Sequence, residues 1–230
     1  MLGGRTVKAT PSTVDPSEKL LPHLQATLAL DWAFPHLRPD LDAASARPFL
    51  ETGAQERFLT ELDAPAHEDP PRAARFRAAL AQVRALADAR EPLTYARLRE
   101  VQAQVLGHPV TFRQGDAFAH GGAHRYLFFP ELEAMFIRKV EADARDDCHP
   151  VAQAARLYLD IAFFHPFPDG NARAARLWLE FLLRRARLPT PALEPLVLLP
   201  KQPGEAQRYE HFVRLLARGI AGRRHCTEES

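Results

Sequence analysis

The stretch HPFPDGNARAAR, residues 165–176, contains most of the chemical information in this sequence. It follows an apolar segment with helical periodicity, and a second helical segment begins near Asn171. Gly170 permits a tight turn that a side chain would resist. The backbone N–H groups from about Asn171 to Arg173 are then the unpaired donors of a helix N-terminus, where the helix dipole adds partial positive charge. The stretch therefore predicts an anion-binding site.

The side chains of this stretch point to phosphate chemistry. Arg173 and Arg176 bring two full positive charges to the start of the predicted helix, where arginine costs up to about 1 kcal/mol unless an anion is bound. Asp169 is a hard oxygen donor of the kind that holds Mg²⁺ together with phosphate oxygens. Asn171 is placed to donate its side-chain amide to the same anion. Histidine has an ordinary pKa near neutrality, so His165 is the natural general base.

Composition restricts the class of protein. The chain has 230 residues, of which 46% are hydrophobic and 26% charged, as is typical of soluble globular proteins. Its formal net charge of +1 gives no bulk field that would attract nucleic acid or an acidic lipid surface. Cys148 and Cys226 lie far apart and predict neither a disulfide scaffold nor a cysteine zinc site. Without a secretory signal or a stretch of membrane-spanning length, we expect a cytoplasmic protein that binds neither nucleic acid nor membrane.

The N-terminal part of the chain has the weakest pattern. Residues 1–19 are small, polar and interrupted by proline, which predicts a mobile arm. Irregular apolar clusters follow, and they predict short helices ended by Pro35, Pro39 and Pro48.

Clear helical periodicity begins at Arg72 and continues through most of the chain. It predicts helices from residue 72, over 94–107, from 130, over 150–164, from 171 to before 189, and over 205–220. Thr94 is the expected N-cap of its helix, and Gly107 is the expected stop. Residues 110–129 break the helical period and predict a loop or a short hairpin.

The motif at residues 165–176 resembles the Fic signature, HxFx(D/E)GN(G)RxxR. The resemblance covers about residues 94–220. TYARLREVQAQVLG is similar to the family's helix before the flap, FRQGDAFAHGGAHRYLFFP to the flap itself, and HPVAQAARLYLDIAFF to the helix that leads into the motif. The resemblance implies an all-α fold, a Fic-type helical bundle with a short β-hairpin flap. We expect this Fic domain over 72–222, preceded by a flexible arm (1–19) and a helical extension (20–71), and followed by a tail (223–230).

Most Fic proteins transfer AMP from ATP to a hydroxyl of a target protein, and the resemblance assigns roles on that basis. His165 would deprotonate the Ser, Thr or Tyr hydroxyl of the target, and Asp169 would bind Mg²⁺. Asn171 and the helix N-terminus would hold the α-phosphate. Arg173 would neutralise the β- and γ-phosphates, and Arg176 would assist it or grip an inhibitory glutamate. The residues that would bind the ATP cofactor are Gly170, Asn171, Ala172, Arg173 and Arg176.

The flap would clamp a segment of the target protein by strand-like main-chain pairing. Its residues are Gly121, Gly122, Ala123, His124, Arg125 and Tyr126. His120 and His124 have the spacing of a pair of metal ligands, but the two glycines between them argue against a helix that would aim both rings one way. We therefore favour a role at the flap surface for both histidines.

Ala172 stands where the family normally has its second motif glycine. A Cβ there would crowd the phosphates or forbid a positive φ, whereas in a helical residue it would cost little. Two alternatives to AMP transfer therefore stay open. One is a Doc-like phosphotransferase or a transferase with another phosphate donor, and the other is a catalytically silent nucleotide-binding interaction protein.

Many family members are silenced by a helix carrying (S/T)xxxE(G/N), whose glutamate pairs with the second motif arginine. Thr52 and Glu56 have this spacing, although Arg57 replaces the final Gly or Asn. Glu56 is thus a candidate inhibitory residue. A separate antitoxin-like inhibitor, or no inhibitor, is the alternative.

Overall fold

A computed structural model describes residues 15, 17–55, 58, 71–145, 147–192 and 205–222. These residues form mostly helices with a small antiparallel sheet, so the predicted all-α fold with a hairpin is confirmed. The elements are α1 (Leu20–Ala29), the 3₁₀ helix η1 (Pro35–Leu37), α2 (Arg38–Ser45), α4 (Arg72–Asp88), α5 (Tyr95–Leu106), β1 (Ala117–Ala119), the 3₁₀ helix η2 (His120–Gly122), β2 (His124–Tyr126), α6 (Leu132–Asp143), α7 (Pro150–Phe164), α8 (Asn171–Arg185) and α10 (Ala206–Ile220).

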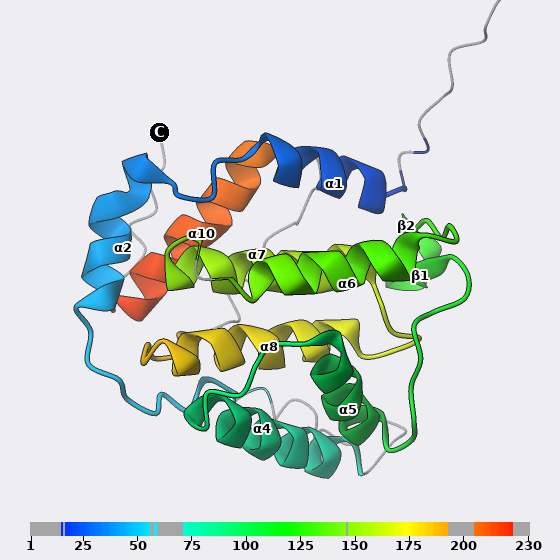
Figure 1. The fold of residues 1–230 in the computed structure, drawn as a ribbon, viewed down its shortest axis with the longest axis horizontal. Coiled ribbons are helices and arrows are strands. Elements are labelled where there is room, and N and C mark those ends of the chain that lie inside the picture. Colours follow the sequence, from blue (N-terminus) through cyan, green and yellow to red (C-terminus); the bar gives the residue numbers. More distant parts are fainter. Residues whose placement is uncertain are drawn as a thin grey trace, which may run out of the picture.

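Helices α7 and α8 form the centre of the bundle (Figure 1). Both are buried along almost their whole length, because neighbouring helices cover them on several sides. Helices α4 and α5 pack against α8, while α6, α10 and α1 pack against α7. Most side chains of such a helix are apolar, and the buried polar ones need partners within the protein. The loop that carries residues 165–170 joins these two helices and is therefore anchored at both ends in the core.

A buried polar network joins α1 and α10 to α7. The Nε2 atom of His23 lies 2.7 Å from the Oδ1 atom of Asp160, and its Nδ1 atom lies 2.7 Å from the hydroxyl of Tyr209. All three side chains are buried. Burial lowers the pKa of His23, so the neutral ring donates to the carboxylate and accepts from the hydroxyl. The network fixes α1 and α10 onto α7.

Most predicted helix ends are confirmed. The Thr94 side chain accepts a hydrogen bond from the Arg97 N–H at 3.3 Å and caps α5, and Gly107 ends α5 with φ +80°. The prediction that Pro39 breaks a helix is wrong, because Pro39 lies in the first turn of α2. Proline is tolerated there, since the N–H it lacks would have no intrahelical partner.

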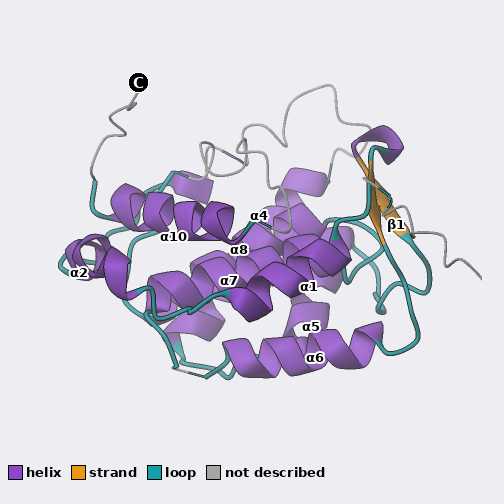
Figure 2. Ribbon diagram, turned by 90° about the horizontal axis from the view of Figure 1, so that it is seen from above, coloured by secondary structure: helices purple, strands orange, loops and turns teal. Residues whose placement is uncertain are grey.

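The hairpin lies at one end of the bundle (Figure 2). Strand β1 pairs antiparallel with β2, with Ala117 opposite Tyr126. The outer edge of β2 is also paired, because the Arg125 N–H donates to the Ser17 carbonyl at 2.9 Å and the Lys19 N–H donates to the Arg125 carbonyl at 3.0 Å. The last residues of the predicted arm are therefore part of the folded structure.

None of the helices within the described residues has the length and apolar character needed to cross a membrane.

Candidate active site

Two residues with positive φ shape the loop between α7 and α8. His165 ends α7 with φ 49° and ψ 55°, and Gly170 precedes α8 with φ 73° and ψ 17°. A Cβ at Gly170 would lie 2.6 Å from the Gln102 Nε2 atom and 3.0 Å from the Arg173 Nη2 atom. Glycine is therefore favoured at this position by its backbone conformation, and a Cβ would also displace the ends of the Gln102 and Arg173 side chains.

Hydrogen bonds from Asn171 and Gln102 hold the loop in shape. The Phe167 N–H donates to the Asn171 Oδ1 atom at 2.9 Å, and the Asn171 Nδ2 atom donates to the Phe167 carbonyl at 2.8 Å. The Gln102 Nε2 atom donates to the Asp169 carbonyl at 2.7 Å. The Asn171 side chain, for which we predicted a contact with the anion, is thus engaged with the loop itself. Gln102 is a site residue that the sequence analysis missed.

The N-terminus of α8 faces the cavity beside this loop. The Ala174 N–H donates to the Gly170 carbonyl at 2.9 Å, which is the first hydrogen bond of the helix. The N–H groups of Asn171 and Ala172 precede this bond, so they have no acceptor within the helix. Ala172 is the second residue of α8, and its φ is not among the positive values of the chain. Alanine at this position therefore causes no backbone strain.

His165 is held as a neutral base. Its Nδ1 atom lies 2.9 Å from the Ala162 carbonyl, which can only accept, so Nδ1 carries the proton and Nε2 carries the lone pair. Burial is the main cause that lowers the pKa of His165 to about 4. Arg113 and His120 lower this pKa further, whereas Asp169 and the hydrogen bond to Ala162 raise it. The imidazole is therefore ready to accept a proton at neutral pH.

Opposite charges meet on the floor of the cavity. The Arg173 Nη2 atom donates to the Asp169 Oδ2 atom at 2.8 Å, and the Asp169 side chain is 73% exposed. Arg173 and Arg176 are both buried. The guanidinium of Arg176 lies 4.0 Å from the centre of the Phe58 ring. These residues, together with His165, line a cavity of about 1050 Å³, which is large enough for a nucleotide.

The residues present fit Mg²⁺ and a nucleotide. Asp169 supplies an accessible carboxylate, the donor type that Mg²⁺ prefers. Across the described part of the chain there is no group of three or more His, Cys, Asp or Glu side chains that could hold a metal alone. A magnesium ion at Asp169 would therefore take further ligands from phosphate and water. The amides of α8 and the guanidinium of Arg173 suit the phosphates.

Arg113 connects the flap to the loop, and the sequence analysis did not single it out. Its backbone N–H donates to the Pro166 carbonyl at 2.9 Å, and its Nη2 atom donates to the Leu127 and Phe164 carbonyls at 2.7 and 3.2 Å. Its Nη1 atom donates to the Gly115 carbonyl. The guanidinium therefore joins both ends of the flap to the C-terminus of α7. Burial lowers the pKa of Arg113 to about 10.

The residues predicted to clamp the target lie in different parts of the hairpin. Gly121 and Gly122 form the tip with φ +65° and +93°, while His124 and Tyr126 line the cavity. The rings of His120 and His124, for which we expected no shared helix, lie across the turn with centroids 4.6 Å apart. The Arg125 guanidinium binds Asp116 and Asp15. The Ala123 backbone N–H donates to the His120 carbonyl within the tip.

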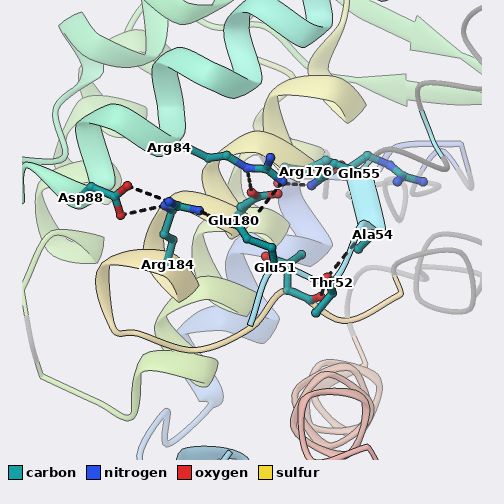
Figure 3. A network of polar contacts seen from close by, with 10 residues as sticks. Glu51, Thr52, Ala54, Gln55, Arg84, Asp88, Arg176, Glu180 and Arg184 are labelled. Atoms are coloured by element: carbon teal, nitrogen blue, oxygen red, sulfur yellow. Dashed lines mark hydrogen bonds and ion pairs between the residues drawn. The ribbon is translucent and has the colours of Figure 1, made fainter. Parts of the chain in front are cut away.

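A segment of the N-terminal extension runs along α8 (Figure 3). Glu51 forms an ion pair with Arg184, near the C-terminal end of α8. The Gln55 Nε2 atom donates to the Arg176 carbonyl at 3.3 Å, nearer the N-terminal end of the helix. Residues 51–55 therefore lead from the far end of α8 toward the cavity.

Glu56, the candidate inhibitory residue, lies outside the described residues. Its described neighbours Gln55 and Phe58 both contact Arg176, one through the backbone carbonyl and the other through the guanidinium. Gln55 and Phe58 thus lie at the motif arginine that the sequence analysis named.

Comparisons with known proteins agree with this geometry. Residues 92–183 match the model of the Fic/DOC family. The chain is 31% identical over 135 residues to "Protein adenylyltransferase Fic" of Drosophila melanogaster, and the match covers 55% of this chain and 25% of that protein. The corresponding protein of Drosophila mojavensis is 30% identical over 135 residues, with the same coverage. The chain thus spans about a quarter of the length of these curated relatives.

Solved structures share the fold. A Fic domain containing signaling protein from Bacteroides thetaiotaomicron matches with a TM-score of 0.52 and 18% identity, over 88% of this chain and 87% of that one. IbpAFic2 covalently tethered to Cdc42 matches with a TM-score of 0.56 and 17% identity, over 83% of this chain and 70% of that one. Residues 92–183 therefore match the Fic/DOC family model, and the fold agrees with that of solved Fic proteins.

Proposed function

We propose that this protein is an adenylyltransferase, which transfers AMP from ATP to a Ser, Thr or Tyr hydroxyl of a target protein. The observation that carries the proposal is the state of His165, whose Nδ1 proton is bonded to the Ala162 carbonyl while its ring lines the same cavity as two buried arginines. A neutral base beside a phosphate-binding helix N-terminus suits the attack of a hydroxyl on a phosphorus atom.

Residues of the loop and of the start of α8 have separate parts in this reaction. His165 accepts the proton of the target hydroxyl at Nε2 while the hydroxyl oxygen bonds to the α-phosphorus. The bond from this phosphorus to the oxygen that bridges to the β-phosphate breaks, and pyrophosphate leaves. The amides at the start of α8, from Asn171 and Ala172, bind the α-phosphate, and Arg173 neutralises the outer phosphates with help from Arg176. Asp169 holds Mg²⁺, which supplies charge neutralisation for the phosphates when it is bound. Gly170 and the side chain of Asn171 keep the loop in shape.

The flap supplies the docking site for the target in this proposal. Pairing with residues 17–19 already occupies the outer edge of β2. The outer edge of β1 is therefore the edge at which an extended target segment would pair, next to Phe118, whose side chain is 61% exposed. The reaction needs no contact with nucleic acid or membrane. The cytoplasmic location stays a prediction.

The contacts of Gln55 and Phe58 with Arg176 support a second part of the proposal, in which Glu56 inhibits the site from within the chain. Inhibition by a separate antitoxin-like chain is the alternative.

The intact mass of the purified full chain, measured after incubation with Mg²⁺ and ATP, tests the activity. His165→Ala is the matched control. A gain of one AMP that is absent from the control supports AMP transfer. A gain of phosphate alone would instead identify a Doc-like phosphotransferase. No gain, with ATP binding still measurable by calorimetry, would favour internal inhibition, another phosphate donor or a catalytically silent nucleotide-binding protein. A gain that appears in Glu56→Ala would identify internal inhibition.

A further inference from the structure

The aromatic ring of Tyr126 lies flat against the imidazole of His165. The two ring centroids are 4.0 Å apart, and the ring planes differ by 18°. Tyr126 is only 6% exposed, so its side chain faces the site rather than the solvent. The imidazole is thus covered on one face by Tyr126 and held at its Nδ1 edge by the Ala162 carbonyl. These two contacts leave the ring little freedom to turn.

The backbone on both sides of Tyr126 is held by the segment before α1. Arg125 exchanges main-chain hydrogen bonds with Ser17 and Lys19, at 2.9 and 3.0 Å. The buried carboxylate of Glu18 accepts hydrogen bonds from the Leu127 N–H at 3.1 Å and from the Leu20 N–H at 2.5 Å. The position of Tyr126 therefore depends on residues 17–19 as well as on its pairing with β1.

We propose that Tyr126 is a positioning residue for His165, and that residues 17–19 act as a third strand of the flap that holds Tyr126 against the imidazole. The inference rests on the function proposed above, in which His165 is the general base. A base contributes most when its ring is fixed in the productive orientation. Stacking supplies this orientation and excludes water from one face of the ring.

The other charged groups around His165 come from separate elements. Arg113 precedes the flap, His120 lies at the flap tip, and Asp169 lies in the loop. None of them is altered when Tyr126 is replaced. A change in the titration of His165 on replacement of Tyr126 therefore reports the loss of the stacked ring.

Proton NMR titration of the His165 ring in the full chain, without nucleotide, tests the role of Tyr126. The signal is identified by its absence from His165→Ala. In the unaltered chain and in Tyr126→Phe, which keeps an aromatic ring on the imidazole, we expect a titration midpoint near pH 4, since the pKa of His165 is about 4. In Tyr126→Ala we expect this pKa to rise by at least about one unit as water reaches the ring.

Phe118→Ala is the matched control, because it removes an aromatic ring from the same flap at a side chain that is exposed. It should leave the pKa of His165 unchanged. The same pKa in Tyr126→Ala as in the unaltered chain would overturn the inference, provided that both proteins show the same cooperative thermal unfolding.

Hydrogen exchange tests the third strand. We expect the amides of Lys19, Arg125 and Leu127 to exchange slowly in the unaltered chain. Glu18→Gln keeps the size of the side chain but replaces one acceptor oxygen by a donor, so the Leu127 amide should exchange at least about tenfold faster. The pKa of His165 should move upward, as in Tyr126→Ala. Exchange of the Lys19 and Arg125 amides at the rate of an unstructured peptide would contradict the third strand.

Activity separates this inference from the proposed function. In Tyr126→Ala, kcat for AMP transfer should fall at least about tenfold with little change in the KM for ATP. Tyr126→Phe should keep most of the kcat of the unaltered chain. If neither the unaltered chain nor Glu56→Ala transfers AMP, the proposed function fails, while the NMR comparison still decides whether Tyr126 positions His165.

Discussion

The carboxylate of Asp169 and the guanidinium of Arg173 form an ion pair, with Oδ2 and Nη2 2.8 Å apart. The residue proposed to hold Mg²⁺ is thus paired with the residue proposed to bind phosphate. This pairing explains how the buried guanidinium is tolerated, since an unpaired buried charge is costly. Binding of Mg²⁺ and ATP has to replace the pair by two separate contacts, one from Asp169 to the metal and one from Arg173 to phosphate.

Asp169→Asn should weaken the response to Mg²⁺, because the amide keeps the shape of the side chain but loses its charge. We expect the Mg²⁺ concentration for half-maximal transfer to rise at least about tenfold and kcat to fall about 10²-fold. Transfer rates measured across a series of Mg²⁺ concentrations check this. Asp116→Asn is a control in the same cavity, because Asp116 binds Arg125 and the Phe128 N–H. An identical Mg²⁺ response in both variants would argue against Asp169 as the ligand.

Gly170→Ala should destabilise the protein and abolish nucleotide binding. The positive φ alone costs roughly 1–2 kcal/mol with a Cβ, and the new atom would meet the Gln102 amide. Thermal unfolding and calorimetry with ATP measure the two effects. Gly121→Ala has a positive φ but nothing within 4 Å, so it should show the strain without the loss of binding. Normal ATP binding by Gly170→Ala would show that the loop does not need this shape.

The pH dependence of transfer should be shallow on the acid side. His165 must be neutral to act as a base, and its pKa is lowered to about 4, so the neutral form persists far below pH 6.5. We expect kcat/KM to hold its value from pH 8 to about pH 5.5, where an exposed histidine with a pKa of about 6.5 would be mostly protonated. A half-loss of activity near pH 6.5 would contradict the buried, neutral base.

Ala172→Gly should reduce stability by up to about 1 kcal/mol, because glycine is the poorer helix former. Ala172 already lies within α8 without positive φ, so we expect the transfer rate to change less than about tenfold. Denaturant unfolding and the initial rate of AMP transfer check the two effects. Activity that appears only in Ala172→Gly would show that the unaltered protein is a silent or very weak enzyme.

Glu56→Ala should raise the rate of AMP transfer, by about tenfold or more, if this residue restrains Arg176. Initial rates with Mg²⁺ and ATP are compared with those of Glu51→Ala, which removes an acid of the same segment that pairs with Arg184. Equal rates in the unaltered chain and in Glu56→Ala would contradict internal inhibition and favour a separate inhibitor or none.

The helices and the loop could be predicted because their signals are local. Thr94 and Gly107 mark the two ends of α5 by their own chemistry, and Gly170 marks the turn before α8. The hairpin was indicated by a break in helical periodicity and a pair of glycines. Such features depend on residues that are neighbours in sequence.

The contacts that hold the site together could not be predicted in this way. Gln102 reaches the Asp169 carbonyl across 67 residues, and Arg113 reaches Phe164 across 51. Gln102 and Arg113 are each one polar residue among many, and the residues next to them in sequence do not indicate which distant residue they contact. Glu18 lies in a stretch whose composition indicates a mobile arm, yet pairing with the flap orders it. Tertiary contacts override local propensity here.

His23 and Tyr209 are 186 residues apart and meet in one buried network on α7. During synthesis, α7 and the loop after it leave the ribosome well before Tyr209 does. Until Tyr209 has been made, the hydrogen-bond network around the buried Asp160 side chain is incomplete. Helix α7 also lacks α10, one of the helices that pack against it. At about 5–20 residues per second, synthesis of the C-terminal helix follows that of the loop by seconds. The buried network on α7 is therefore completed only after α10 has been made, later than the loop that α7 leads into.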